Sequence, residues 1–162
     1  MNESTQRKLF KYLLNKKIEN FVGVPDSTLK YFIDEGLKNK KILIATREDE
    51  AIGIATGMIL SNSPSLVFMQ NAGFANSIST LTSLIQLYKI PIIILLGWRG
   101  FLKNDAPEHT KIGKIQPQLI RSIGIKSKII DENNWKDTCK WALKTIRHGS
   151  PCILIVKRIF ND

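Results

Sequence analysis

The sequence has few of the features that mark disulfide-rich, secreted or membrane-spanning chains. It contains two cysteines, Cys139 and Cys152, too few for a disulfide framework and without the spacing of a zinc site. Both are expected to be small buried hydrophobic residues. The richest apolar run, Ile90–Trp98, is far too short to cross a bilayer, and Met1–Lys17 lacks the apolar core of a secretory signal. We therefore expect a cytoplasmic protein without a membrane segment.

Several common site motifs are also missing. No G-x-G-x-x-G follows the first expected strand and no G-x-x-x-x-G-K-[ST] occurs, which disfavours a dinucleotide site and a P-loop. A G-x-S-x-G nucleophile elbow is lacking as well. The two histidines, His109 and His148, are not at metal-ligand spacing, so this chain is not expected to supply a metal site.

Acidic residues are scarce beside basic ones, 14 against 24, which gives a formal net charge of +10. The excess lies in residues 82–162, which hold 14 basic and 6 acidic residues, whereas residues 1–81 hold 10 and 8. It is spread over several expected elements without interleaved aromatic residues, which favours a solvated surface over a nucleic-acid site. A nucleic-acid-binding module would instead show steeply salt-dependent binding.

Charge is almost absent from one long stretch. Between Ala51 and Trp98 the only charged residue is Lys89. A stretch of this length cannot be mostly exposed to solvent in a protein of this composition. We therefore expect it to form core, or a surface that another chain covers.

Helix-like and strand-like segments alternate along the 162 residues, a length that suits one domain with its own core. The expected strands are Asn20–Val24, Lys41–Ala45, Ser65–Met69, Pro91–Leu96, Lys126–Ile130 and Cys152–Val156. The expected helices are Ser4–Asn15, a segment from Asp26 or Ser27 to Glu35, Glu48–Leu60, Phe74–Leu87, Pro117–Ile123 and Asn134–Arg147. This alternation predicts a three-layer α/β sandwich around a six-stranded, mainly parallel sheet.

The helix expected from Glu48 begins with three consecutive acids and continues without charge. Residues 51–60 are apolar or small on every side, which predicts a helix buried all round. Gly53 and Gly57 each cost about 1 kcal/mol of helix propensity, but they let another backbone approach closely. All three acids can stabilise the helix N-terminus electrostatically. This is the expected role of Asp49 and Glu50. For Glu48 it is the alternative to a functional role.

The segment Arg47–Gly57 resembles the E-x-x-A-x-x-x-A-x-G segment of the pyrimidine-binding (PYR) domain of thiamine-diphosphate-dependent decarboxylases. Glu48, Ala51, Ala55 and Gly57 occupy its defined positions. Further blocks look like the phosphonopyruvate decarboxylase family, with the sulfopyruvate decarboxylase alpha subunit as a more distant match. These blocks are 23–27, 69–73, 76, 81–84, 88–91, 97–100 and 105–109. Beyond Lys114 the likeness is one of general pattern.

The resemblance implies a split enzyme. Single-chain members also carry a diphosphate-binding (PP) domain, in which a G-D-G segment and a later asparagine anchor Mg²⁺ and diphosphate. This sequence has no G-D-G and no room for such a domain, so we expect a single PYR domain over residues 1–162. It would be the alpha subunit of a hetero-oligomer whose PP-domain beta subunit holds the metal. A non-catalytic subunit that keeps the PYR fold for assembly is the alternative.

The resemblance also implies a reaction, the decarboxylation of a 2-oxo acid with thiamine diphosphate as cofactor. The expected substrate is 3-phosphonopyruvate, which would give phosphonoacetaldehyde and carbon dioxide in phosphonate biosynthesis; sulfopyruvate or another 2-oxo acid is the alternative. Glu48 would hydrogen-bond N1′ of the aminopyrimidine and so activate the cofactor, in a dry site that raises its pKa.

Seven further residues receive candidate roles by the same resemblance. Cofactor contacts are expected from Gln70, Asn71 and Gly73, substrate contacts from Arg99, Asp26 and Ser27, and catalytic roles from His109 and Asp26. Ordinary structural roles remain open for several of them. Asp26 and Asn71 can cap helices, Arg99 can form an ion pair, and His109 can be a loop histidine.

Overall fold

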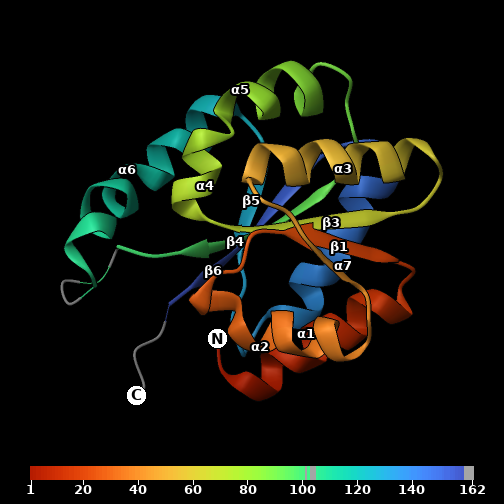
Figure 1. Cartoon of the computed structure of the whole chain (residues 1–162), viewed down its shortest axis with the longest axis horizontal. Coiled ribbons are helices and arrows are strands. Elements are labelled where there is room, and N and C mark those ends of the chain that lie inside the picture. Colours follow the sequence, from red (N-terminus) through yellow and green to blue (C-terminus); the bar gives the residue numbers. More distant parts are fainter. Residues whose placement is uncertain (101, 103–104, 159–162) are drawn as a thin grey trace.

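The structure is a computed structural model and describes residues 1–100, 102 and 105–158. Six strands form one sheet in the order β2–β1–β3–β4–β6–β5, and every neighbouring pair is parallel (Figure 1). The strands are β1 (Asn20–Gly23), β2 (Ile42–Ile44), β3 (Ser65–Gln70), β4 (Ile93–Trp98), β5 (Lys126–Ile129) and β6 (Cys152–Lys157). The predicted α/β fold with a six-stranded parallel sheet is confirmed.

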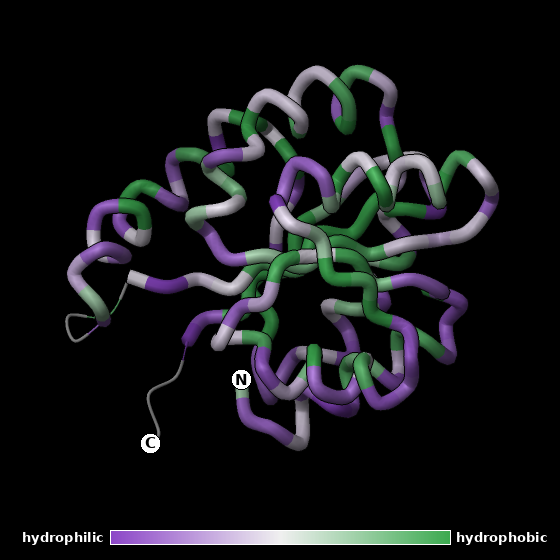
Figure 2. The backbone as a smooth tube through the Cα atoms, in the orientation of Figure 1, coloured by the Kyte–Doolittle hydropathy of each residue, from purple (hydrophilic) through white to green (hydrophobic). Residues whose placement is uncertain are grey.

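Helices cover both faces of the sheet. On one face lie α1 (Glu3–Asn15), α2 (Lys30–Lys38), which follows the short 3₁₀ turn η1 (Ser27–Leu29), and α7 (Trp135–Arg147). On the other lie α3 (Glu48–Leu60), α4 (Asn71–Asn76), α5 (Ile78–Thr80), the π-helix η2 (Leu81–Gln86) and α6 (Pro107–Ile123) (Figure 1). The strands form the greenest, most hydrophobic layer, between helices that carry most of the purple, hydrophilic positions (Figure 2).

Alternation along the central strands divides the core into two layers. In β3, Leu66 and Phe68 join the cluster beneath α1, α2 and α7, whereas Val67 and Met69 join the cluster beneath α3 and α6. Successive side chains of a strand point to opposite faces, so uninterrupted apolar strands fill both layers. No helix in the described part of the chain has the length and apolarity needed to cross a membrane.

The single helix predicted over Phe74–Leu87 is wrong, because the segment is divided into α4, α5 and the π-helix η2. Hydroxyl groups along it bond to carbonyls of the preceding turn: Ser77 Oγ donates to Gly73 O at 2.9 Å, and Thr82 Oγ1 lies 3.0 Å from Ile78 O and from Ser79 O. Such bonds compete with the backbone ladder and bend helices. The helix therefore widens rather than continuing regularly.

The helix expected over Pro117–Ile123 begins ten residues earlier, at Pro107, so that Pro117 lies inside α6. Proline has no N–H, and the carbonyl four residues before it, that of Gly113, loses its usual partner. Trp98 Nε1 donates to that carbonyl at 2.9 Å. A side chain at the end of β4 thus replaces the missing backbone bond.

The prediction that α3 is buried all round is also wrong. Ala51, Ile52 and Ala55 are fully buried against the sheet, but Gly53 and Gly57 are exposed, and apart from their neighbours and the backbone of α3 itself, no atom lies within 4 Å of the Cβ position of either. Absence of charge predicted burial, yet one face of the helix is open in the single chain. The other expectation, a surface that another chain covers, is the one consistent with this exposure.

Candidate functional site

The candidate residues follow strands beside the topological switch point of the sheet, where β2 and β3 lie on opposite sides of β1. From β1 the chain continues outward to the edge strand β2, then returns to place β3 on the other side of β1. Ligands of parallel sheets bind at the carboxyl ends of strands beside such a switch point. Asp26 follows β1, Gln70 ends β3, and Gly97 lies near the end of β4.

Asp26 is a buried carboxyl at this switch point, 4% exposed. Its Oδ1 accepts from the Thr28 N–H at 3.1 Å and from Gln70 Nε2 at 3.4 Å. Its Oδ2 is buried without a hydrogen-bond partner among the described residues and rests on Gly97, where a Cβ atom would collide with it. Burial raises the pKa of Asp26, and the Thr28 and Gln70 bonds, with the charge of Arg99, oppose this only in part.

The other two acids of the α3 N-terminus have local partners. Arg47 Nε donates to Asp49 Oδ1 at 3.0 Å, and the Thr46 N–H donates to a Glu50 carboxylate oxygen at 2.8 Å. These contacts agree with the helix-terminal roles expected for both acids.

Glu48 is different. Its carboxyl, half-buried, makes no hydrogen bond or ion pair with any described residue and packs directly on Gly73 in α4. A Cβ atom at position 73 would overlap that carboxyl, so glycine at this position makes room for it. The structure therefore brings together Glu48 and Gly73 and leaves the carboxylate oxygens of Glu48 available to a ligand.

Asn71 links the ends of β3 and β4. Its side chain is fully buried; Nδ2 donates to the Arg99 carbonyl at 3.0 Å and Oδ1 accepts from the Arg99 N–H at 3.2 Å. The amide therefore holds the backbone of Arg99 from both sides. Direct contact of Asn71 with a cofactor stays a prediction.

The Arg99 guanidinium is paired rather than free. Its Nη2 donates to Asp105 Oδ1 at 2.7 Å, and both side chains are largely buried. Burial raises the pKa of Asp105, but the Arg99 bond, together with those from the N–H groups of Gly100 and Ala106, outweighs it and lowers the pKa to about 2. Arg99 Nε is buried without a partner among the described residues.

His109 and Ser27 lie at the margins of this arrangement. His109 is half-buried in the first turn of α6, where its carbonyl packs against Gly100 and its Nε2 lies 3.9 Å from a Glu108 carboxylate oxygen. Ser27 is exposed, with Arg158 Nη1 at 3.5 Å from its hydroxyl. Neither side chain has a hydrogen bond to Asp26, Glu48 or Arg99 within the described part of the chain.

Sequence reasoning missed three residues of this region: Thr28, Gly97 and Asp105. Asp105 had a detectable signal, because it lies two residues before the Pro107-Glu108 helix start and in a block already matched to the family. Gly97 also lies in a matched block, but its contact with Asp26 depends on the approach of two separate strands, which the sequence does not show. Thr28 had no signal. Asp26 and Ser27 also line an open groove of about 380 Å³ along α2, beside Lys30 and Asp34.

Comparison with known proteins places the chain in a class. Residues 4–120 match the family model described as "Thiamine pyrophosphate enzyme, N-terminal TPP binding domain". The chain belongs to this family. Its match covers all the strand ends from β1 to β4 and therefore the whole candidate site.

Named relatives fall into two groups. A sulfopyruvate decarboxylase subunit alpha from Methanococcus maripaludis is 33% identical over 119 residues, covering 72% of this chain and 71% of that protein. A phosphonopyruvate decarboxylase from Streptomyces viridochromogenes is 31% identical over 106 residues, covering 64% of this chain and 27% of that protein. The likeness to the sulfopyruvate decarboxylase subunit is thus the more extensive of the two, the reverse of the expected order.

Solved structures support the fold. A benzoylformate decarboxylase from Polynucleobacter necessarius superposes with a TM-score of 0.71 at 19% identity. The alignment covers 97% of this chain and 31% of that one, so the chain spans about a third of that enzyme.

Proposed function

We propose that this chain is the alpha subunit of a thiamine-diphosphate-dependent 2-oxo acid decarboxylase, formed by one PYR domain. The observation that carries the proposal is Glu48 at the start of α3, a carboxylate that makes no hydrogen bond or close ion pair with a described residue and packs on Gly73 of α4. An aminopyrimidine ring presents a nitrogen that such a carboxyl can hydrogen-bond, so the residues fit this cofactor. Membership of the TPP-binding family supports the same assignment.

When bound, thiamine diphosphate supplies a carbon nucleophile for the keto carbon and an acceptor for the electron pair left by departing carbon dioxide. Glu48 would hold the proton shared with N1′ of the aminopyrimidine, at the first turn of α3, which carries no charge beyond Glu50. Gly73, which has no side chain, would leave the space that the Glu48 carboxyl occupies. Gln70 would orient Asp26 through its 3.4 Å hydrogen bond. The Oδ2 of Asp26, raised in pKa by burial, would hold a proton that can be delivered to the product.

The substrate we propose carries a second anionic group besides its carboxylate. Arg99 supplies a cation beside the site, and its Nε, buried without a partner among the described residues, is the donor we propose for a sulfonate or phosphonate. His109 and Ser27 are proposed as further contacts at the margin. Sulfopyruvate is the first candidate because the sulfopyruvate decarboxylase alpha subunits match over more of the chain. 3-Phosphonopyruvate is the second, favoured by relatives of that name at 31% and 30% identity.

A partner chain completes this proposal. Three of the sulfopyruvate decarboxylase relatives are named as alpha subunits, and they are matched over 71%, 68% and 48% of their length. We propose that a beta subunit with a PP domain holds Mg²⁺ and diphosphate, and that it covers the exposed, uncharged face of α3. Cofactor-dependent turnover that arises only when the two chains are mixed would separate this proposal from a non-catalytic assembly subunit.

The direct test is Glu48→Gln, assayed with the partner, thiamine diphosphate, Mg²⁺ and each substrate side by side. Removal of an acid that holds a proton in the reaction lowers turnover by about 10²–10⁴-fold. Asp49→Asn is the matched control, because Asp49 lies in the same helical turn and pairs with exposed Arg47. We expect the control to keep full turnover and both variants to keep the wild-type melting temperature. Turnover at the wild-type rate by Glu48→Gln would refute the assignment.

A further inference from the structure

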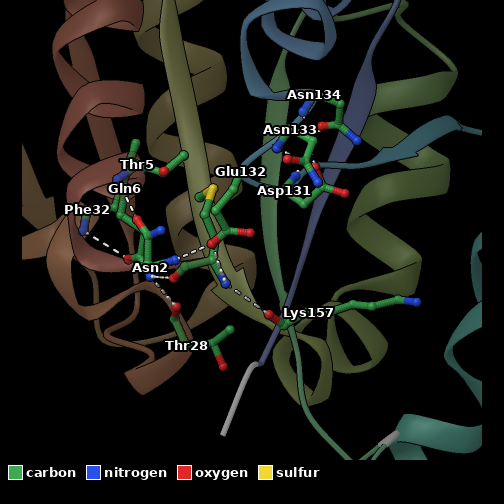
Figure 3. A network of polar contacts seen from close by, with 11 residues as sticks. Asn2, Thr5, Gln6, Thr28, Phe32, Asp131, Glu132, Asn133, Asn134 and Lys157 are labelled. Atoms are coloured by element: carbon green, nitrogen blue, oxygen red, sulfur yellow. Dashed lines mark hydrogen bonds and ion pairs between the residues drawn. The ribbon is translucent and has the colours of Figure 1, made fainter. Parts of the chain in front are cut away.

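A buried amide from α1 reaches the turn that carries Asp26. Gln6 is 3% exposed, and its Nε2 donates to the Thr28 carbonyl at 3.1 Å and to the Met1 carbonyl at 2.8 Å (Figure 3). Its Oε1 accepts from the Phe32 N–H at 3.2 Å. One side chain thus bonds to the backbone on both sides of the junction between η1 and α2.

These bonds satisfy groups that the local sequence leaves unpaired. The first four N–H groups of a helix have no partner within it, and Leu29, at the N-cap of α2, makes no side-chain cap. Gln6 supplies the acceptor for Phe32, the third residue of that helix. A residue from a separate helix therefore acts as the missing cap.

The same amide fixes Asp26 through one intermediate residue. Thr28 is held at both ends of its backbone, because its N–H donates to Asp26 Oδ1 at 3.1 Å and its carbonyl accepts from Gln6. Thr28 is itself 6% exposed, so no water competes freely for these groups. Displacing the Gln6 amide would release the turn and with it the donor that orients the Asp26 carboxyl.

We propose that Gln6 is a positioning residue that holds the Asp26 carboxyl in its buried place at the switch point. The effect of Gln6 on turnover rests on the proposed function, in which Asp26 delivers a proton. The effect of Gln6 on the position of Asp26 does not rest on that function, since it concerns only contacts within this chain.

The titration of Asp26 reports on this position. The charged groups around Asp26 are Arg99, after β4, Arg158, after β6, whose Nη1 lies 3.5 Å from the Ser27 hydroxyl, and Lys30 and Asp34 on α2. None of the hydrogen bonds of Gln6 goes to these four residues, so substituting Gln6 leaves their charges in place. Burial raises the pKa of Asp26 and the Thr28 bond lowers it, so a turn that releases this donor while the carboxyl stays buried raises the pKa further.

The test uses Gln6→Met, which keeps the side-chain length and removes both polar atoms. NMR of the Asp26 carboxyl carbon in the full-length chain should show its pKa rising above that of the wild type, because the Thr28 donor is released. Gln6→Asn, a milder change that keeps the amide but shortens its reach, should give a smaller shift in the same direction and serves if Gln6→Met does not fold. The matched control is Asn20→Ala, which removes an amide bonded to Ser63 Oγ at 2.7 Å at the opposite end of β1.

The control should lose stability without moving the Asp26 titration. An unchanged Asp26 pKa in both folded Gln6 variants would overturn the proposal. With the partner present, the pH profile of kcat should shift upward with the Asp26 pKa. A shifted pKa with an unchanged kcat profile would leave the positioning role intact and count against the proton-delivering role of Asp26.

Discussion

At the scale of single residues, each candidate carboxyl rests on a glycine. Glu48 lies on Gly73, and Asp26 Oδ2 lies on Gly97, in both cases where a Cβ atom would stand. The resemblance to the family gave Gly73 a cofactor contact, whereas the geometry gives it a steric role toward Glu48. Neither glycine has a positive φ, so close approach rather than backbone conformation requires them.

Gly73→Ala tests this steric role. The added methyl must displace the Glu48 carboxyl, so we expect turnover with the partner to fall by at least about tenfold, equivalent to about 1.4 kcal/mol. Overpacking of this kind also lowers the free energy of unfolding by about 1–3 kcal/mol. Steady-state assays and urea unfolding would measure the two effects. Full turnover by the variant would show that the Glu48 position does not matter.

Asp105→Asn tests the buried pair with Arg99 through its pH dependence. The folded-state pKa of Asp105, about 2, is below the ordinary value of 3.8, so its contribution to stability is complete above pH 4 and is lost as pH falls toward 2. We expect the variant to be about 2 kcal/mol less stable than wild type at pH 7. That difference should shrink to near zero by pH 2. Urea unfolding at several pH values measures it, and a difference independent of pH would contradict the prediction.

At the scale of elements, the strands and the regular helices α3 and α7 were predictable, but the start of α6 and the irregular helices were not. The helix α3 begins at Glu48 and α7 ends at Arg147 as expected, because acidic first turns and apolar periodicity act locally. The long α6 was missed because Pro117 indicates a helix start when only neighbours in sequence are considered. Its continuation depends on Trp98, which is distant in sequence and adjacent in space.

A double-mutant cycle measures this replacement bond. Trp98→Phe leaves the Gly113 carbonyl without a donor, at a cost of about 1–3 kcal/mol for an unsatisfied buried group. In a Pro117→Ala background, the new N–H at position 117 can reach that carbonyl, so the same Trp98 substitution should cost less. We expect a coupling energy of about 1 kcal/mol from urea unfolding of the four proteins. Strict additivity would show that the two positions do not share the Gly113 carbonyl.

At the scale of the whole molecule, the uncharged stretch forms a surface as well as core. Buried residues of α3 and η2 fill one core layer, but Leu60, Leu87 and Tyr88 are 70%, 68% and 67% exposed on the same side of the sheet. The partner proposed above would cover exposed apolar residues on this side of the sheet. Sequence alone predicted core or a covered surface and could not divide the residues between them, because burial depends on which face of each helix meets the sheet.

The paired substitution Gly53→Ala with Gly57→Ala separates folding from assembly at this surface. Both positions are open in the single chain, so alanine should only improve helix propensity and raise the free energy of unfolding by about 2 kcal/mol for the pair. If the partner's backbone approaches these glycines closely, the two methyl groups must weaken association. We expect the variant to need more partner for half-maximal cofactor-dependent activity, at least about tenfold more.

Lys144→Ala, in α7 on the opposite face of the sheet, is the control and should associate as wild type does. Urea unfolding of the isolated chain and titration with the partner measure the two effects separately. Because glycine is the poorest helix former after proline, its presence at two exposed helical positions needs an advantage outside the single chain. A more stable variant with unchanged association would show that the partner does not approach α3 closely, and would move the expected interface to another face of the domain.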